Sequence, residues 1–286
     1  MSGMLSLVGT PIGNIQDASP RVRETLASAD TILCEDTRVS GKLLALLGIR
    51  ARLERCDENV IESRIPAILE RLAAGERIAF ISDAGMPGIS DPGQRLMDAA
   101  LDEGIPTEVI PGPSAVTCAL VASGLPSEHF FFEGFLPRKA GDQKRRLAEL
   151  APIPGALIIY ESPRRVAATL KAIAEAFPER RVALIRELTK IHEEVVRGRA
   201  PELAEEVCAR PEIKGECVIV VAPPSDEELE QLRRGAASLP SLEDAIAEGL
   251  AAGEPKSGLA KRLAKAYGIS RQEAYGKILD AAAGED

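Results

Sequence analysis

The sequence predicts an α/β protein with two α/β domains, followed by a small all-α extension that is helix-turn-helix-like. Three observations support this prediction. Strand-like and helix-like patterns alternate over most of the chain. Apolar runs break into glycine and proline three times, at residues 8–14, 81–93 and 109–115. From residue 239 onward the chain is rich in alanine and has no strand pattern.

The first α/β domain is predicted over residues 1–112. Ser19 followed by Pro20 predicts the start of one helix, Gly48 predicts the end of the next, and Asn59 is expected to cap a third. Strands are expected at 5–8, 31–35, 77–82 and 107–110, and helices at 20–29, 39–47, 60–74 and 93–103. This alternation indicates βαβ crossovers and a parallel or mostly parallel sheet.

The second α/β domain is predicted over residues 113–224. A helix follows Pro113, and Ser162 with Pro163 is expected to cap another helix that ends near Ala176. Strands are expected at 130–133, 156–161, 181–186 and 216–221. The segment that begins at Pro223 predicts a linker that enters a polar helix.

The helical extension is predicted over residues 238–286. Gly268 ends one amphipathic helix, and Ser270 with Glu273 forms a capping box that opens the next. Although the whole chain has a net charge of −9, residues 255–279 contain six basic residues and one acidic residue. This charge favours nucleic acid binding; a packing appendage or a dimer arm is the alternative.

Composition sets the class of protein. The chain has 286 residues, and 45% of them are hydrophobic, which is typical of a globular protein. It has no apolar run long enough for a membrane helix, and its first residues lack the basic region of a signal peptide, so a cytoplasmic protein is expected. The five cysteines are scattered without a C-x-x-C spacing, which supports neither a zinc site nor a disulfide framework.

The first glycine-bearing turn excludes two common ligand classes. Residues 9–13 match neither the G-x-G-x-x-G dinucleotide motif nor a phosphate-binding loop. Pro11 also removes one of the backbone N–H donors that such loops direct at phosphate. The carboxyl ends of parallel strands nevertheless share one sheet edge, so the three turns together predict a single ligand cleft.

Four further segments complete a recognisable pattern: residues 34–38, 133–139, 160–165 and 186–194. Together with the three turns they resemble the tetrapyrrole methylase superfamily of S-adenosylmethionine-dependent methyltransferases. Within it they are similar to the 16S ribosomal RNA (cytidine-2′-O)-methyltransferase branch. The resemblance covers residues 4–222 and implies two α/β domains that form an interdomain cleft, S-adenosyl-L-methionine as the cofactor, and a homodimer.

The resemblance also implies which residues contact the cofactor. They belong to the three turns and to the start of the helix after the third turn. The implied set is Pro11, Gly13, Asp83, Ala84, Gly85, Ile89, Ser90, Ser114 and Ala115. A carboxylate such as Asp83 can accept hydrogen bonds from ribose hydroxyls or face the sulfonium.

Methylation of a ribose hydroxyl requires alignment of the reacting atoms and help in removing the hydroxyl proton. Asp36, Thr37 and Arg38 follow a strand that ends on the same sheet edge as the turns, so they are the first candidates. Arg38 is expected to stabilise an oxyanion or a phosphate, and Asp36 to orient Arg38 or to act as the base. Glu161, Glu187 and Lys190 are second catalytic candidates. For each acid, an internal ion pair is the structural alternative.

Basic residues indicate where RNA binds. In the second domain the candidates are Arg138, Lys139, Arg164 and Arg165, and in the extension they are Lys256, Lys261, Arg262, Lys265 and Arg271. With six phenylalanines, three tyrosines and no tryptophan, the chain offers few platforms for base stacking. Recognition of folded RNA by its shape and phosphates is therefore expected.

The sequence thus predicts a methyltransferase that acts on the ribose 2′-hydroxyl of a cytidine in 16S rRNA, in the small ribosomal subunit. Two alternatives stay open at this point. One is a methyltransferase of the same fold that acts on a small tetrapyrrole, and the other is a non-catalytic RNA-binding protein.

Overall fold

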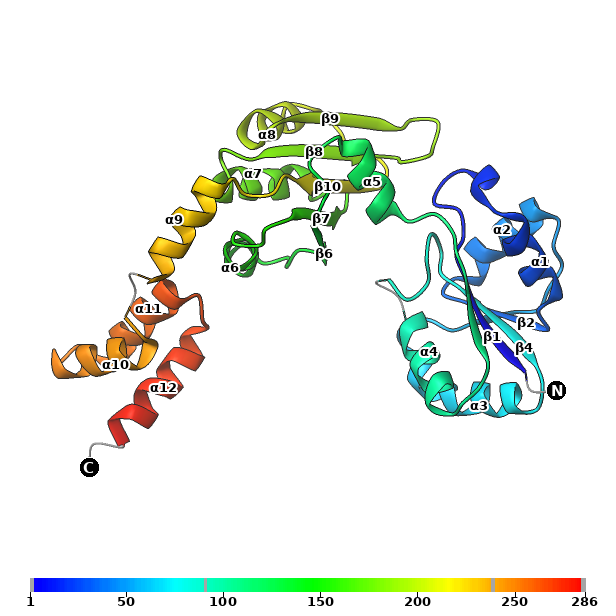
Figure 1. Cartoon of the computed structure of the whole chain (residues 1–286), viewed down its shortest axis with the longest axis horizontal. Coiled ribbons are helices and arrows are strands. Elements are labelled where there is room, and N and C mark those ends of the chain that lie inside the picture. The colour runs from blue at the N-terminus through cyan, green and yellow to red at the C-terminus, as the bar shows by residue number, and fades with distance from the viewer. Residues whose placement is uncertain (1–2, 90–91, 238–239, 284–286) are drawn as a thin grey trace. The chain divides into compact units, whose positions relative to one another are not determined.

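The computed structural model describes residues 3–89, 92–237 and 240–283, and it contains two five-stranded sheets with helices (Figure 1). The chain divides into two compact units. The first comprises the described residues up to Gly124, together with Leu184–Val196 and Lys214–Val218. The second comprises Leu125–Ala183, Arg197–Ile213 and the described residues from Ile219 onward. The domain boundaries expected from the sequence, after residues 112 and 224, stay a prediction.

The first sheet has the strand order β3-β2-β4-β1-β5 and is parallel throughout. Its strands are β1 (Met4–Val8), β2 (Thr31–Cys34), β3 (Leu53–Arg55), β4 (Arg77–Ile81) and β5 (Thr107–Ile110). In the central register, Leu7 of β1 lies opposite Phe80 of β4 and Val109 of β5. The predicted parallel sheet is confirmed.

Helices cover both faces of this sheet, which is why its central strands are apolar without alternation. They are α1 (Pro20–Ser28), α2 (Thr37–Leu47), α3 (Ile61–Ala73) and α4 (Gly93–Asp102), with a short 3₁₀ helix at Ile15–Asp17. Leu7 and Phe80 face the core under α3 and α4, whereas Val8 and Ile81 face the core under α1 and α2. The predicted cap at Ser19 is confirmed, because its hydroxyl accepts the Val22 N–H at 3.3 Å.

Two details of the first unit differ from the sequence prediction. Asn59 does not cap α3: Val60 is the N-cap residue and makes no side-chain bond. Asp57 holds this turn instead, by accepting the Asn59 N–H at 3.0 Å. Strand β3 was not predicted because its three residues, Leu53–Arg55, are partly exposed and mostly charged.

The second sheet has the strand order β6-β7-β10-β8-β9. Its strands are β6 (Phe130–Phe135), β7 (Ala156–Glu161), β8 (Arg181–Arg186), β9 (Glu194–Arg199) and β10 (Cys217–Val221). The helices that follow Pro113 in sequence order are α5 (Ala115–Ser123), α6 (Ala140–Leu150), α7 (Val166–Ala176) and α8 (Ala200–Cys208). Strands β6 and β7 are parallel, with a shift of register between Phe132 and Gly134.

One cap predicted in the second unit is wrong. Helix α7 begins at Val166 with Arg165 as its N-cap, so Ser162 and Pro163 do not cap it. They lie in a turn that the Arg165 N–H closes on the Ser162 carbonyl at 3.0 Å. The predicted end of this helix at Ala176 is confirmed.

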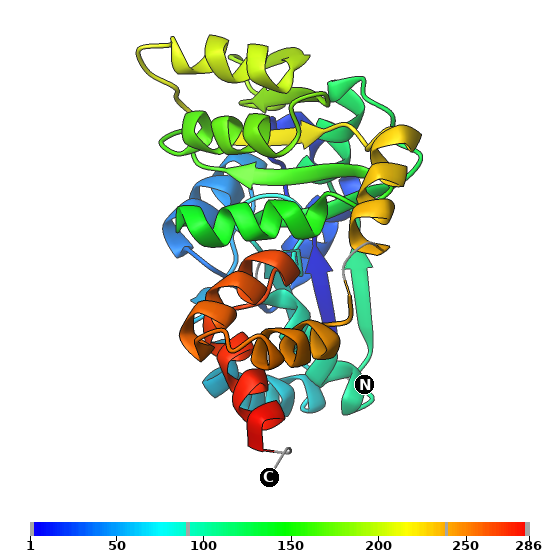
Figure 2. The same ribbon diagram turned by 90° about the vertical axis from the view of Figure 1, so that its left-hand side faces the viewer.

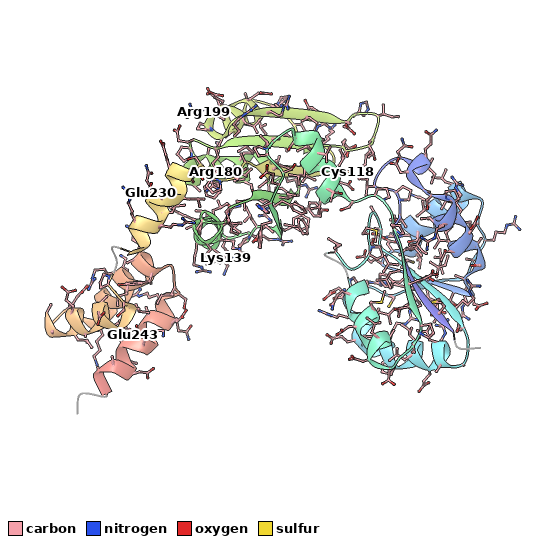
Figure 3. The ribbon with its side chains drawn as sticks, viewed as in Figure 1. Cys118, Lys139, Arg180, Arg199, Glu230 and Glu243 are labelled. Atoms are coloured by element: carbon pink, nitrogen blue, oxygen red, sulfur yellow. The ribbon has the colours of Figure 1, made fainter. Side chains whose placement is uncertain are left out.

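A buried arginine attaches α9 (Asp226–Ala237) to the second unit. Arg180, labelled in Figure 3, has a side chain that is 2% exposed. It donates to the Glu228 carboxylate at 2.7 Å and to the Ala151 carbonyl at 2.6 Å, and its guanidinium lies 4.3 Å from the centre of the Phe177 ring. The polar helix predicted after Pro223 is thereby confirmed and anchored.

The C-terminal extension is a cluster of three helices, α10 (Leu242–Ala251), α11 (Lys256–Tyr267) and α12 (Arg271–Ala283), coloured orange to red in Figure 2. They share a core that includes Ile246, Leu263 and Ile278. Gly268 has a φ of 68° at the turn between α11 and α12, and Ser270 accepts the Glu273 N–H at 3.0 Å. The predicted helix-turn-helix-like pair is confirmed. None of the described helices has the length and hydropathy needed to cross a bilayer.

The Arg180 contacts predict a large effect on stability. Replacing Arg180 by methionine leaves the Glu228 carboxylate without its partner, and we expect the free energy of unfolding to fall by about 3 kcal/mol. Urea denaturation monitored by circular dichroism measures this change. Arg181→Met at the neighbouring exposed position is the control and should change stability by less than about 0.5 kcal/mol. Equal effects of the two substitutions would contradict the anchoring role.

Candidate active site

Three loops meet at the carboxyl ends of β1, β4 and β5. Thr10 and Gly85 form a two-residue antiparallel bridge, with backbone hydrogen bonds of 2.9 and 3.1 Å. The Gly9 N–H donates to the Ile110 carbonyl at 2.9 Å, and the Gly112 N–H lies 3.1 Å from the Met86 sulfur. The three turns that were expected to lie together therefore do so within the first unit.

Two glycines permit this convergence. A Cβ atom on Gly9 would lie 2.6 Å from the Gly112 nitrogen, and a Cβ atom on Gly112 would lie 2.6 Å from the Gly9 carbonyl carbon. Both contacts involve main-chain atoms, which cannot turn aside as a side chain can. Gly85 adds a φ of 84° at the bridge, a conformation that favours glycine. Gly9 and Gly112 are thus needed because the two main chains approach too closely for a side chain, and Gly85 is favoured by its left-handed backbone conformation.

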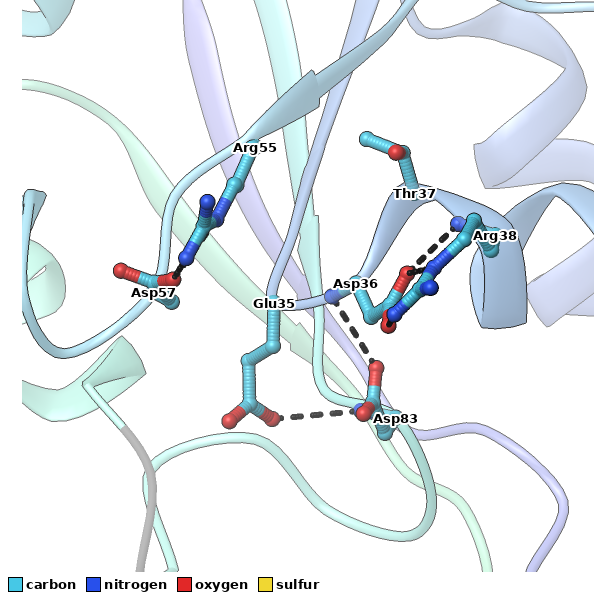
Figure 4. Close-up of a pocket in the computed structure, with 7 residues that line it drawn as sticks. All are labelled: Glu35, Asp36, Thr37, Arg38, Arg55, Asp57 and Asp83. Carbon is cyan, nitrogen blue, oxygen red and sulfur yellow. Dashed lines mark hydrogen bonds and ion pairs between the residues drawn. The ribbon is translucent and has the colours of Figure 1, made fainter.

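A cavity of about 450 Å³ opens beside these loops, at the ends of the adjacent strands β2, β3 and β4 (Figure 4). Its lining consists of four carboxylates, two guanidinium groups and one threonine. They are Glu35, Asp36, Thr37, Arg38, Arg55, Asp57 and Asp83. The excess of carboxylates gives the cavity a negative character, which suits a ligand that carries positive charge.

Asp36 and Arg38 form a clamp at the start of α2. The Asp36 carboxylate accepts the Arg38 backbone N–H at 2.8 Å and the Arg38 guanidinium at 3.0 and 2.6 Å. These bonds hold the pKa of Asp36 well below its ordinary value and raise the pKa of Arg38. Asp36 is therefore a weak proton acceptor, and its geometry supports the orienting role that the sequence allowed. The Arg38 side chain is 87% exposed, so its remaining N–H groups face solvent.

Asp83 has the opposite electrostatic environment. Its carboxylate accepts the Asp36 N–H at 3.2 Å, and its own N–H donates to Glu35 at 3.2 Å. Burial raises the pKa of Asp83, and the nearby Asp36 charge raises it further, against the hydrogen bond from the Asp36 N–H. By contrast, Arg55 donates to Asp57 at 2.7 Å and lowers the pKa of Asp57. Of the three aspartates Asp36, Asp57 and Asp83, Asp83 is accordingly the most basic.

A strained loop of the first unit touches the first turn. Glu187 has a φ of 52° and Thr189 a φ of 67°, which is rare for a β-branched residue. A Cβ atom on Gly13 would lie 2.7 Å from the Thr189 hydroxyl oxygen and 2.5 Å from Cγ of Lys190. The loop therefore packs directly on Gly13, one of the residues expected to contact the cofactor.

Glu187, a catalytic candidate, is paired in this loop. It accepts hydrogen bonds from Lys190 Nζ and from the Glu216 N–H, each at 3.0 Å, and these bonds lower its pKa. Burial disfavours the charge of Lys190, but bonds to the Glu187 and Glu216 carboxylates outweigh it and raise the Lys190 pKa. The contacts around Glu187 are those of an ion pair.

Glu161, another second candidate, lies in the second unit with a side chain that is 0% exposed. It accepts hydrogen bonds from the Ser162 N–H at 2.8 Å and from the Thr169 hydroxyl at 2.7 Å. Arg165 Nη2 lies 3.3 Å from it. Its carboxylate oxygens are thus committed to the local structure at the start of α7.

The structure locates most of the other predicted site residues. On the loops of the first unit lie Pro11, Gly13, Asp83, Ala84, Gly85, Ile89 and Ser114, and Ala115 is the first residue of α5. Ser90 lies outside the described residues. Ser114 is the N-cap residue of α5 and makes no side-chain bond there. Ile89 is 49% exposed, so it can supply an apolar contact to a ligand.

The predicted RNA-binding residues separate into different environments. Arg138, Arg164 and Arg165 line one cavity of the second unit, whereas Lys139, labelled in Figure 3, is the N-cap residue of α6. In the extension, Lys256, Lys261 and Lys265 are exposed. Arg262 is bound to Glu254 at 2.7 Å, and Arg271 donates to the Ser257 carbonyl at 3.4 Å.

Three cavity residues were missed by sequence reasoning: Glu35, Arg55 and Asp57. Arg55 is the last residue of β3 and Asp57 follows it, and an edge strand of three residues leaves almost no hydrophobic pattern. Glu35 was assigned to the preceding strand, which ends one residue earlier, at Cys34. The signal that could have identified the two acids is an acidic residue shortly after each of three successive strands: Glu35 after β2, Asp57 after β3 and Asp83 after β4.

Comparisons with known proteins agree with this architecture. Residues 4–204 match the model of the Tetrapyrrole (Corrin/Porphyrin) Methylases. The chain belongs to this family. It is 44% identical over 277 residues to the Ribosomal RNA small subunit methyltransferase I of Mesorhizobium japonicum, which covers 96% of this chain and 91% of that protein. The protein of the same name from Mycobacterium bovis is 42% identical over 282 residues, which cover 97% of this chain and 95% of that one.

A solved structure extends the comparison to the fold. Uroporphyrin-III C-methyltransferase from Thermus thermophilus, complexed with S-adenyl homocysteine, matches with a TM-score of 0.54 and 19% identity. The match covers 77% of this chain and 97% of that one. The predicted family and the predicted α/β fold class are both confirmed.

The contact between Gly9 and Gly112 predicts the effect of a single methyl group. Gly9→Ala forces main-chain atoms apart, and we expect the free energy of unfolding to fall by roughly 2 kcal/mol or more. Gly41→Ala is the control, because its Cβ atom would meet only Leu53 Cδ1, at 3.7 Å. In helix α2 this control should raise stability by about 0.5–1 kcal/mol. Thermal and urea denaturation of both variants measure the difference.

The opposite pKa shifts of Asp83 and Asp36 predict opposite pH dependence. Because folding raises the pKa of Asp83, its ionisation opposes folding, so Asp83→Asn should gain stability relative to the parent protein as pH rises from about 4 towards 7. Because folding lowers the pKa of Asp36, Asp36→Asn should be less stable at pH 7, and the deficit should shrink as pH falls below about 4. Urea denaturation at a series of pH values tests both, and parallel curves would contradict the assignment.

Proposed function

We propose that this chain transfers the methyl group of S-adenosyl-L-methionine to the ribose 2′-hydroxyl of a cytidine in 16S rRNA of the small ribosomal subunit. The observation that carries the proposal is the identity of 42–44% over nearly the whole chain to proteins named Ribosomal RNA small subunit methyltransferase I. The choice of the cytidine 2′-hydroxyl comes from the resemblance of the sequence motifs. We further propose a homodimer that works in the cytoplasm, where ribosomal subunits are found.

The residues of the first unit fit such a cofactor. Its sulfonium and α-ammonium groups are cationic and outnumber its one carboxylate, and the cavity at the ends of β2, β3 and β4 is lined by four carboxylates against two guanidinium groups. Asp83 provides an acceptor at the edge of this cavity, and the exposed Ile89 and Ala84 provide apolar surface on the same loop. When bound, the cofactor supplies an electrophilic methyl group.

The protein's own contribution in this proposal is placement and charge. The tied loops around Gly9, Gly85 and Gly112 hold the cofactor wall in one position, and placement of reacting atoms alone can lower a barrier by ~7–11 kcal/mol. Asp36 orients Arg38, and the Arg38 guanidinium stabilises the negative charge that develops on the acceptor oxygen. Asp83, with its raised pKa, is the better proton acceptor of the cavity if a side chain removes the hydroxyl proton.

The test is incubation of the protein with labelled S-adenosyl-L-methionine and small ribosomal subunits that lack the modification. Nuclease mapping should place the label on the ribose oxygen of one cytidine. Label on a base atom would contradict the reaction type. Label on a tetrapyrrole and none on RNA would favour the small-molecule alternative, and cofactor binding that calorimetry cannot detect would favour a non-catalytic RNA-binding protein.

Asp83 gives a specific prediction for cofactor binding. Loss of a hydrogen bond to a charged group should make Asp83→Ala bind S-adenosyl homocysteine about ten- to 100-fold more weakly. Isothermal titration calorimetry measures the dissociation constant. Asp98→Ala, an exposed aspartate on α4, is the matched control and should bind as the parent protein does. Unchanged binding by Asp83→Ala would remove Asp83 from the cofactor site.

A further inference from the structure

We propose that a second cavity, in the second unit, binds one unstacked nucleotide of single-stranded RNA. Its base lies on Phe135, and its phosphates are held by Arg138 and Arg164. The inference rests on the proposed function, which makes RNA the substrate, and it assigns a role to an aromatic residue that the sequence did not single out.

The cavity has a volume of about 800 Å³ and lies where β6 and β7 end and α7 begins. This volume falls in the range of ~300–1,000 Å³ that is typical of small-molecule sites. Phe135, Pro137 and Pro163 give it apolar walls, and Arg138 and Arg164 give it positive charge. Apolar surface beside guanidinium groups suits a ligand with a flat ring and an anionic group, which is the chemistry of a nucleotide.

Phe135 is a stacking platform that its neighbours hold in place. Its residue surface is 59% exposed, although it lies in a strand. The Tyr160 ring contacts it edge-on, with ring centres 5.8 Å apart, and Tyr160 also meets the Phe132 ring at 4.8 Å. The fold therefore gathers three of the chain's nine aromatic residues at one sheet edge. Stacking of a base on such a ring is tolerant of sequence and strong.

Arg138 and Arg164 are available for phosphate. Both are exposed, and neither has an ion pair or a side-chain hydrogen bond within the part of the chain that the structure describes. Nearby arginines differ: Arg146 is bound to Glu133 at 2.7 Å, and Arg145 to Asp142 at 3.0 Å. A free guanidinium can engage phosphate through two parallel hydrogen bonds without first breaking an internal one.

Glu161 and Arg165 form the frame of the cavity. Arg165 Nη2 donates to the carbonyls of Leu136 and Pro137 at 3.0 and 3.3 Å, and it lies 3.3 Å from the buried Glu161 carboxylate. This network ties the loop after β6 to the start of α7, so the cavity exists before a ligand arrives, which reduces the entropy lost on binding. In this inference Arg165 and Glu161 are positioning residues, whereas Arg138 and Arg164 contact RNA.

The experiment uses the full-length protein and a single-stranded RNA of about ten nucleotides, a length within the usual footprint of single-strand binding proteins. One uridine of the RNA carries 5-iodouracil, which cross-links to a stacked aromatic ring on irradiation. Mass spectrometry of the parent protein should find the cross-link on Phe135. A duplex of the same sequence should give far less cross-linking, because its bases stay stacked on one another.

Fluorescence anisotropy with the same RNA measures the energetic contribution of the ring. Phe135→Ala should weaken RNA binding roughly five- to 100-fold relative to the parent protein, whereas Phe135→Trp, which keeps an aromatic ring, should bind RNA as tightly as the parent. Phe130→Ala is the matched control: Phe130 is 47% exposed and lies at the other end of the same strand. It should bind RNA as tightly as the parent protein. Circular dichroism and melting temperature confirm that each variant is folded.

A salt titration tests the arginines separately. For single-stranded RNA, loss of one phosphate contact lowers the slope of log K against log salt by about 0.7. Arg164→Ala and Arg138→Ala should each show this change, whereas Arg181→Ala, at an exposed position at the start of β8, should not.

Cross-links on other peptides, equal binding by Phe135→Ala and Phe130→Ala, or equal affinity for single strand and duplex would each overturn the inference. These outcomes can be separated from failure of the proposed function. If the protein methylates small subunits but Phe135→Ala does not change its RNA affinity, the proposed function is supported and this site is not. If RNA binding depends on Phe135 but no methyl transfer is detected, the site is supported and the proposed function is not.

Discussion

The contact between the main chains of Gly9 and Gly112 is the constraint on which the first unit's site depends. These glycines follow β1 and β5, neighbours in the sheet, and each excludes a side chain at the other. Because the loops touch through backbone, the Thr10–Gly85 bridge can form beside them and fix the loop after β4 as well. A rigid wall then arises from residues that carry no reactive group. Reactive side chains can be placed next to it with little freedom to move.

Two of those side chains, Asp36 and Asp83, have pKa values that are shifted in opposite directions. The Asp36 carboxylate accepts hydrogen bonds from the Arg38 backbone N–H in α2 and from the Arg38 guanidinium. These bonds lower the pKa of Asp36 and favour its ionised form. Its negative charge in turn raises the pKa of Asp83, whose carboxylate accepts the Asp36 N–H. Two aspartates at neighbouring strand ends thus have pKa values that are pushed apart. Such a division allows one group to carry charge while the other exchanges a proton.

The sequence predicted the parallel sheet, its long helices and the convergence of the three turns, because hydrophobic pattern and glycine or proline positions are local signals. It missed β3, and with it Arg55 and Asp57, because a short edge strand gains its stability from pairing with β2. It placed a cap at Ser162, where the buried Glu161 carboxylate instead organises the turn. It also expected few stacking platforms, since a count of aromatic residues cannot show that Phe132, Phe135 and Tyr160 come together.

Backbone strain in the loop around Thr189 adds a last link between the segments of the first unit. Left-handed φ values at Glu187 and Thr189 raise the energy of this loop, so other contacts must hold it. Glu187 lies over Gly215, where any side chain would meet its carboxylate, and Lys190 joins Glu187 to Glu216. Thr189 and the Lys190 stem of the same loop pack on Gly13. The strained segment is held by an ion-pair cluster and by its contact with Gly13 in the first turn, and it keeps one position only while both contacts are intact. The strain therefore makes the geometry of the first turn depend on residues some 175 positions further along the chain.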